Sequence, residues 1–248
     1  MNERPIIEEP QKVEDIQIVE ETVHMDIWRR FLGIIIDPLN TFKVIKSDPK
    51  VLIPLTFILS ISVMIALFVL PESKAFSEEI VAKMGQNVPK QSMLTTGIWS
   101  VVGILILYPI MFLLQALVLF IYDQLSVGKA KFKQLFAVVL YAGIPNVLMQ
   151  VIATILTKSI GLKATMNVRL SLALFWPGND QASYLFQILN QANFFAIWGL
   201  ILLIIGGSIV MGKDAKKLAI YTIILWLIYI TGKGAITAFQ MNMLKGIM

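Results

Sequence analysis

The sequence predicts an all-α protein, a polytopic membrane bundle of five transmembrane helices with short amphipathic helices at the membrane surface. The 248 residues are 57% hydrophobic and have a mean hydropathy of +0.76, well above the average of soluble domains. Five apolar stretches are also long enough to cross a bilayer. A helix rises about 1.5 Å per residue, so about 20 residues cross a hydrocarbon core of about 30 Å.

The five predicted spans cover residues 51–70, 98–122, 135–157, 193–211 and 218–239 and form one membrane domain over 51–248. The last span is interrupted by Lys233, which lies far enough along the helix for its amine to reach the headgroups. No hydrophilic stretch is long enough for a folded external domain, so we expect short interfacial helices in the segment 158–192.

Positive charge predicts the direction of the spans. Basic residues cluster before the first span and in the two short links, 123–134 and 212–217. Because cytoplasmic loops carry an excess of Lys and Arg, we expect a cytoplasmic N-terminus. Five crossings then place the C-terminus outside, in a multi-pass protein of a plasma membrane. The net charge of +5 is local to these loops and does not indicate nucleic-acid binding.

Two segments precede the first span. Residues 1–25 hold seven acidic and two basic residues, which predicts a mobile tail that is either a solvated linker or a docking segment. Residues 26–50 predict two short amphipathic helices on the inner leaflet, with packing beneath the bundle as the alternative. The residues expected to contact this leaflet are Trp28, Arg29, Arg30, Phe31, Lys43 and Lys46.

Span three contains residues that disfavour a helix. Pro145 has no backbone N–H and crowds the carbonyl of Tyr141, so we expect a kink there. Lipid cannot satisfy the freed acceptors, so this face must meet protein or trapped water. Small and polar residues of span three share a face, and polar residues of span two recur every seven positions, so we predict that the two faces meet. This seam comprises Tyr108, Pro109, Gln115, Tyr141, Gly143, Pro145, Asn146, Gln150 and Thr154.

The seam allows a substrate cavity, a hinge, or polar packing between helices. Charged residues are almost absent from the spans. Asp123 at an inner end is expected to pair with Lys129 or Lys131. The spans offer no set of acid, base, nucleophile or metal ligands, so the sequence predicts neither an enzyme nor a cofactor.

Three strings resemble the YIP family, the Ypt/Rab-interacting membrane proteins. They are "DPLNTFKVIKSDP" before the first span, "GKAKFKQLFAVVLYAGIPNVL" at span three and "NFFAIWGLILLIIGGSIVMGKDAKKLAIYTIILWLI" over the last hairpin. The resemblance covers about residues 28–235 and implies five spans. The Asp-Leu-Tyr-Gly-Pro motif of eukaryotic relatives is missing, so the resemblance indicates the prokaryotic branch and does not extend to Rab-type GTPase binding.

Two functions fit these features. The first is a non-enzymatic accessory or scaffold protein that binds other integral membrane proteins and aids a membrane complex, for example an exporter. The alternative is a transporter or pore for an apolar or amphiphilic solute that uses the kinked seam between spans two and three.

Overall fold

The computed structural model describes residues 25–83, 93–168, 170–178 and 180–245. These residues form helices and short connections, with one isolated β-bridge between Ser171 and Asn193. The predicted acidic tail lies outside the described residues except for its last position. The helical fold class is therefore confirmed for the part of the chain that the structure describes.

The helices follow one another in this order: α1 (Ile27–Ile36), α2 (Pro38–Ser47), α3 (Leu52–Phe68), α4 (Leu70–Lys83), α5 (Met93–Leu125), α6 (Phe132–Ala142), α7 (Ile144–Ile160), α8 (Leu162–Asn167), the 3₁₀ turn η1 (Leu172–Phe175), α9 (Tyr184–Gln191), α10 (Phe194–Met211) and α11 (Ala215–Lys245).

Four helical segments are long and apolar enough to cross a membrane. They are α5, the pair α6–α7 taken together, α10 and α11. The pair α3 and α4 passes the same test but is bent by 56° at the break between the two helices. The prediction of a multi-span bundle is confirmed, with four spans or five when the bent pair counts as one crossing.

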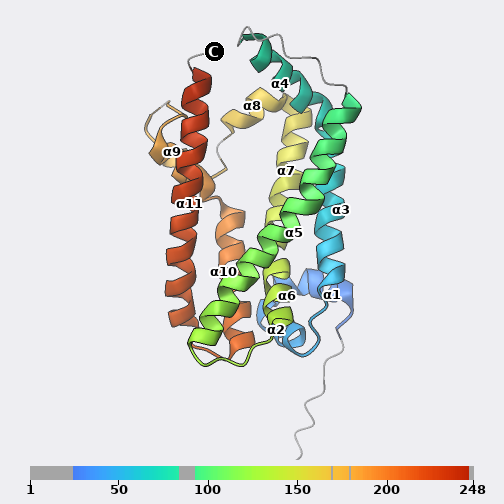
Figure 1. The fold of residues 1–248 in the computed structure, drawn as a ribbon, viewed down its shortest axis with the longest axis vertical. Coiled ribbons are helices and arrows are strands. Elements are labelled where there is room, and N and C mark those ends of the chain that lie inside the picture. The colour runs from blue at the N-terminus through green and yellow to red at the C-terminus, as the bar shows by residue number, and fades with distance from the viewer. Residues whose placement is uncertain (1–24, 84–92, 169, 179, 246–248) are drawn as a thin grey trace, which may run out of the picture.

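The central column of the bundle is α6–α7 (Figure 1). In its most apolar window 56% of the residues are buried, against 11% for α5 and 17% for α11. Helix α6 packs on α5 and α10, whereas α7 packs on α3 and α10. Helices α3, α5 and α10 therefore surround this column, and α11 packs on α10. The outer faces of α5 and α11 are rich in exposed Leu and Ile.

Local signals in the sequence set several helix ends. Asp37 caps α2 by accepting a hydrogen bond from the Asn40 amide at 3.3 Å, and Pro38 occupies the first turn. Asn193 caps α10 by accepting from the Ala196 amide at 2.8 Å. Gly212 ends α10 with a φ of +65°, a conformation that glycine adopts without the cost of a side chain.

Helices α1 and α2 close one end of the bundle, where α6 begins (Figure 1). We call this the basic end, because the basic residues before span one and those of both short links lie there. Lys46 donates to the Ile209 carbonyl at 2.9 Å, and Gln134 donates to the Lys46 carbonyl at 2.7 Å. The three basic groups thus share one end. That this end faces the cytoplasm remains a prediction.

The opposite end, here called the far end, carries α4, α8, η1 and α9. Helix α9 packs on α11, and Gly234 allows the contact because a Cβ there would lie 2.8 Å from Ile188 Cγ1. These short elements lie against the bundle as packed connections.

The close packing around Gly206 predicts a difference in stability between two glycine-to-alanine variants. A Cβ on Gly206 of α10 would lie 2.6–2.8 Å from the fully buried ring of Phe42, so G206A should lower the free energy of unfolding by about 1–3 kcal/mol through overpacking. The control is G103A in α5, where a Cβ meets nothing within 4 Å. Thermal unfolding in detergent measures both. Equal melting temperatures for the two variants would contradict this packing.

Candidate functional site

The helix break in the central column falls at Gly143, two residues before Pro145. The Asn146 amide donates to the Gly143 carbonyl at 3.0 Å, an i to i−3 bond that tightens the turn. Pro145 itself is buried, and Gly143 faces α5, since a Cβ there would lie 3.3 Å from Phe112 Cε1. Protein therefore covers the proline side of the break.

Helix α10 approaches the break through Gly199. A Cβ at Gly199 would lie 2.9 Å from the Ala142 carbonyl oxygen and 3.4 Å from Asn146 Nδ2. Only a residue without a side chain allows the backbone of α10 to lie this close. The last carbonyl of α6 is thereby shielded by α10.

The polar face of α7 is divided between two neighbours. Gln150 accepts a hydrogen bond from Ser62 of α3 at 3.2 Å, and Thr154, which is buried, donates to the Gln150 carbonyl at 2.8 Å. Asn146 lies beside Gly199 of α10 and is exposed. One helical stripe thus meets α3 at one position and borders α10 at another.

The predicted contact of Gln115 with the polar face of α7 is wrong, although α5 shares a polar cavity with that face through Thr96 and Ser100. Tyr108 and Pro109 are half-buried in α5, which runs unbroken through the proline, and Gln115 is exposed. Helix α5 packs on α6, and its buried residues Ala116 and Leu119 belong to the same apolar core cluster as Leu135 of α6. The seven-residue repeat marked a real stripe, but apolar residues beside it make the contact.

Tyr141 belongs to the core at the basic end. Its side chain is fully buried, and its ring lies 5.8 Å from that of Phe31, centroid to centroid. Phe31 in turn packs on Phe57 of α3 at 4.5 Å. This aromatic cluster joins α1, α3 and α6 directly below the helix break.

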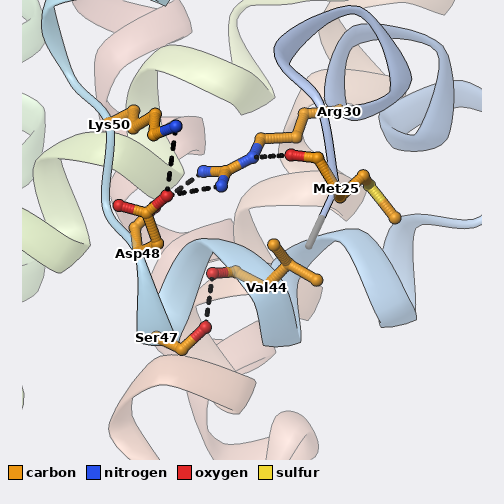
Figure 2. Close-up of polar contacts among 6 residues, drawn as sticks. All are labelled: Met25, Arg30, Val44, Ser47, Asp48 and Lys50. Atoms are coloured by element: carbon orange, nitrogen blue, oxygen red, sulfur yellow. Dashed lines mark hydrogen bonds and ion pairs between the residues drawn. The ribbon is translucent and has the colours of Figure 1, made fainter. Parts of the chain in front are cut away.

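A buried arginine holds the two amphipathic helices in place (Figure 2). Arg30 is 1% exposed, and its guanidinium donates to the carbonyls of Met25 at 3.0 Å and Asp48 at 2.7 Å and to the Asp48 carboxylate at 2.6 Å. Lys50 lies 3.4 Å from the same carboxylate. Two of these hydrogen bonds tie α1 to the turn between α2 and α3, and the third holds the segment that precedes α1.

The charge of Asp48 responds to this pairing. Partial burial alone would raise the pKa of this carboxyl group, but the hydrogen bond and charge of Arg30, with Lys50 behind it, hold the pKa below its usual value. A lowered pKa means that the pair stabilises the fold above the ordinary carboxylate range and loses this effect as the pH falls through the folded pKa.

The predicted inner-leaflet contacts divide into two groups. The prediction is wrong for Arg30 and Phe31, which are buried in the bundle. Arg30 pairs with the Asp48 carboxylate there, and Phe31 packs on Phe57. Trp28, Arg29, Lys43 and Lys46 are exposed. With Trp28, the apolar side chains of Leu32, Ile35, Ile36 and Leu39 form an exposed surface, which we call the α1 surface.

Asp123 does not pair with Lys129 or Lys131 as expected. Its fully buried carboxylate lies 3.3 Å from Lys213 Nζ and accepts from the Ala130 amide at 2.9 Å. Lys213 also donates to the carbonyls of Asp123 and Ser126 at 3.1 and 3.0 Å, at the end of α5. One lysine thus joins the two short links.

The residues that sequence reasoning missed were Ser62, Gly199 and the partners of Arg30. Gly199 had a usable signal, since it precedes Gly206 by seven residues on one face of α10. Ser62 and Asp48 had no such signal, because the sequence around each residue does not indicate which distant side chain it contacts. Among the described residues, no three His, Asp or Glu side chains gather where they could hold a metal ion.

These features define a polytopic α-helical membrane protein with a broken, polar central column. The Yip1 domain matches residues 32–236, and the chain belongs to the Yip1 family. The family resemblance predicted from the three strings is confirmed. No curated protein and no solved structure matches the chain.

The arginine network predicts a contrast between neighbouring residues. R30A removes a buried stem and three hydrogen bonds, so it should lower the free energy of unfolding by about 2–4 kcal/mol. R29A changes an exposed side chain and should cost less than about 0.5 kcal/mol. Melting temperatures in detergent at neutral pH compare the two. If R29A and R30A melt together, Arg30 does not hold the basic end.

Proposed function

We propose that this Yip1-family protein is a non-enzymatic accessory or scaffold protein of a prokaryotic plasma membrane. It binds other integral membrane proteins and aids the assembly, positioning or activity of a membrane complex such as an exporter. Its basic end lies in the cytoplasm. A transmembrane helix of a different protein, with hydrogen-bonding or small side chains, binds at Gln115 and Asn146. We call these two residues the partner surface.

One observation carries this proposal. Gln115 and Asn146 are exposed although each lies within an apolar membrane-spanning segment. Acyl chains offer no hydrogen bonds, so an amide left in lipid is costly, whereas an amide against a partner helix has donors and acceptors to meet.

The basic end supports the same role. On the α1 surface, Trp28 is 68% and Ile36 79% exposed, and the basic side chains of Arg29 and Lys43 are exposed on the same two helices. Apolar side chains beside lysine and arginine suit the boundary of an anionic leaflet. We propose that α1 lies at the inner leaflet and holds the bundle at fixed depth for its partner.

The geometry favours this role over a transporter that uses spans two and three. A route along the predicted seam needs Tyr108 and Gln115 of α5 to face Gln150 of α7. Gln150 instead bonds to Ser62 of α3, Gln115 is exposed, and the buried contact between α5 and α6 is apolar. We therefore assign the exposed amides to recognition.

Photo-crosslinking in native membranes tests the proposal. A benzophenone amino acid at position 115 or 146 of the full chain should capture the same heterologous membrane protein. The control position is Ile106, which is exposed on α5 and lies nine residues before Gln115, on the opposite face of the helix. The double variant Q115L/N146L should reduce co-purification of that protein at least about tenfold, with unchanged expression.

Three results would contradict the proposal. Adducts at positions 115 and 146 that contain only lipid would leave the amides without a protein partner. Adducts only with a second copy of the chain would make the surface a homodimer interface. Capture that is equally strong at position 106 would show contact without recognition.

A further inference from the structure

A cavity of about 490 Å³ lies between α3, α4, α5 and α7 in the half of the bundle nearer the far end. Six of its twelve lining residues carry a hydroxyl group, five are apolar, and the last is Gln150. This volume falls within the range of about 300–1,000 Å³ typical of small-molecule sites. The proposed partner surface does not include this cavity.

Three of the six hydroxyl groups in the cavity present acceptors to a ligand. Ser77 donates to the Ser73 carbonyl at 2.9 Å, Ser100 to the Thr96 carbonyl at 2.9 Å, and Thr154 to the Gln150 carbonyl at 2.8 Å. Each proton is therefore used within its own helix, and the oxygen lone pairs remain directed outward. A ligand that fits these three oxygens must bring its own donors.

Gln150 supplies the complementary group. Its Oε1 accepts from Ser62 at 3.2 Å, which orients the amide and leaves the Nε2 hydrogens without a bond among the described residues. A ligand that donates to the serine and threonine oxygens and accepts from this amide has hydroxyl groups. A tertiary or quaternary ammonium group has no suitable set of donors and acceptors.

The charge of the lining and the position of the cavity in the bundle restrict the class of ligand further. No charged side chain lines the cavity, but Glu72 and Lys158 form an ion pair at 2.7 Å on the neighbouring turns of α4 and α7. Ile65 and Leu70 lie among the apolar lining residues. The cavity thus sits between a charged rim and the apolar bundle, at the depth where a lipid headgroup joins its chains.

We propose that this cavity binds the headgroup and glycerol region of an uncharged, hydroxyl-bearing lipid such as a glycosyl diacylglycerol. The sugar hydroxyls donate to Ser77, Ser100 and Thr154 and accept from Gln150. The acyl chains pass the apolar side of the cavity toward the bilayer. The lack of charged lining residues disfavours phosphate-bearing headgroups, whose burial would need a paired cation.

Native mass spectrometry of the full-length protein in detergent tests this site. The probes are monoglucosyl dioleoylglycerol, dioleoylphosphatidylcholine and free glucose. The glucosyl lipid should bind at least about tenfold more tightly than either of the other two. T154V should weaken its binding about three- to tenfold by removing one acceptor, and A66L should weaken it further by filling the cavity.

The matched control is T56V, a substitution of the same kind at an exposed residue of α3 outside the cavity. It should bind the glucosyl lipid as the wild type does. Equal binding of the glucosyl lipid and phosphatidylcholine would overturn the proposal, as would equal binding of free glucose. Because A66L keeps every polar group, wild-type affinity in both A66L and T154V would also place the lipid elsewhere.

Discussion

The structure depends on keeping the broken part of α6–α7 away from lipid. A proline in a membrane helix removes a backbone donor, and hydrocarbon offers no substitute. Here Phe112 covers one side of the break, and the backbone of α10 covers another through Gly199. This requirement explains why α6–α7 is the most enclosed span. The remaining helices are arranged around a segment that could not stand at the surface.

At the basic end, cationic side chains supply hydrogen-bond donors to backbone carbonyls near the ends of helices. Lys213 binds the last carbonyls of α5, and Arg30 binds carbonyls on both sides of the amphipathic helices. A cation beside the carbonyls at the C-terminal end of a helix also opposes the negative end of the helix dipole. Arg30 and Lys213 therefore contribute to architecture, which leaves their exposed neighbours available for the bilayer.

Much of the fold could be predicted from the sequence because apolar length and charge are local properties. The apolar runs gave the membrane-crossing helices, and Pro145 lies next to the actual break. Pairing could not be predicted in the same way. The spacing of Asn146, Gln150 and Thr154 indicates that one face of the helix is polar, but it does not indicate which helix packs against that face.

Arg30 shows the same limit. Arg29 and Arg30 are neighbours of the same residue type, but Arg30 lies on the buried face of α1 and meets Asp48, eighteen residues later, whereas Arg29 is exposed. At the candidate site, Gln150 was identified by its polarity, whereas its partner Ser62 could be found only in three dimensions. Residue types thus predicted which side chains matter, and the packing of distant segments decided what each one contacts.

The central claim is that Gln150 of the column pairs with Ser62 of α3 and not with Gln115 of α5. The chain contains no cysteine, so paired cysteines can test it without background. A short membrane-permeant bis-thiosulfonate should cross-link the pair S62C/Q150C within one chain, because the two native side chains lie 3.2 Å apart. The pair Q115C/Q150C should stay unlinked. Efficient linkage of Q115C/Q150C, with S62C/Q150C unlinked, would contradict the account.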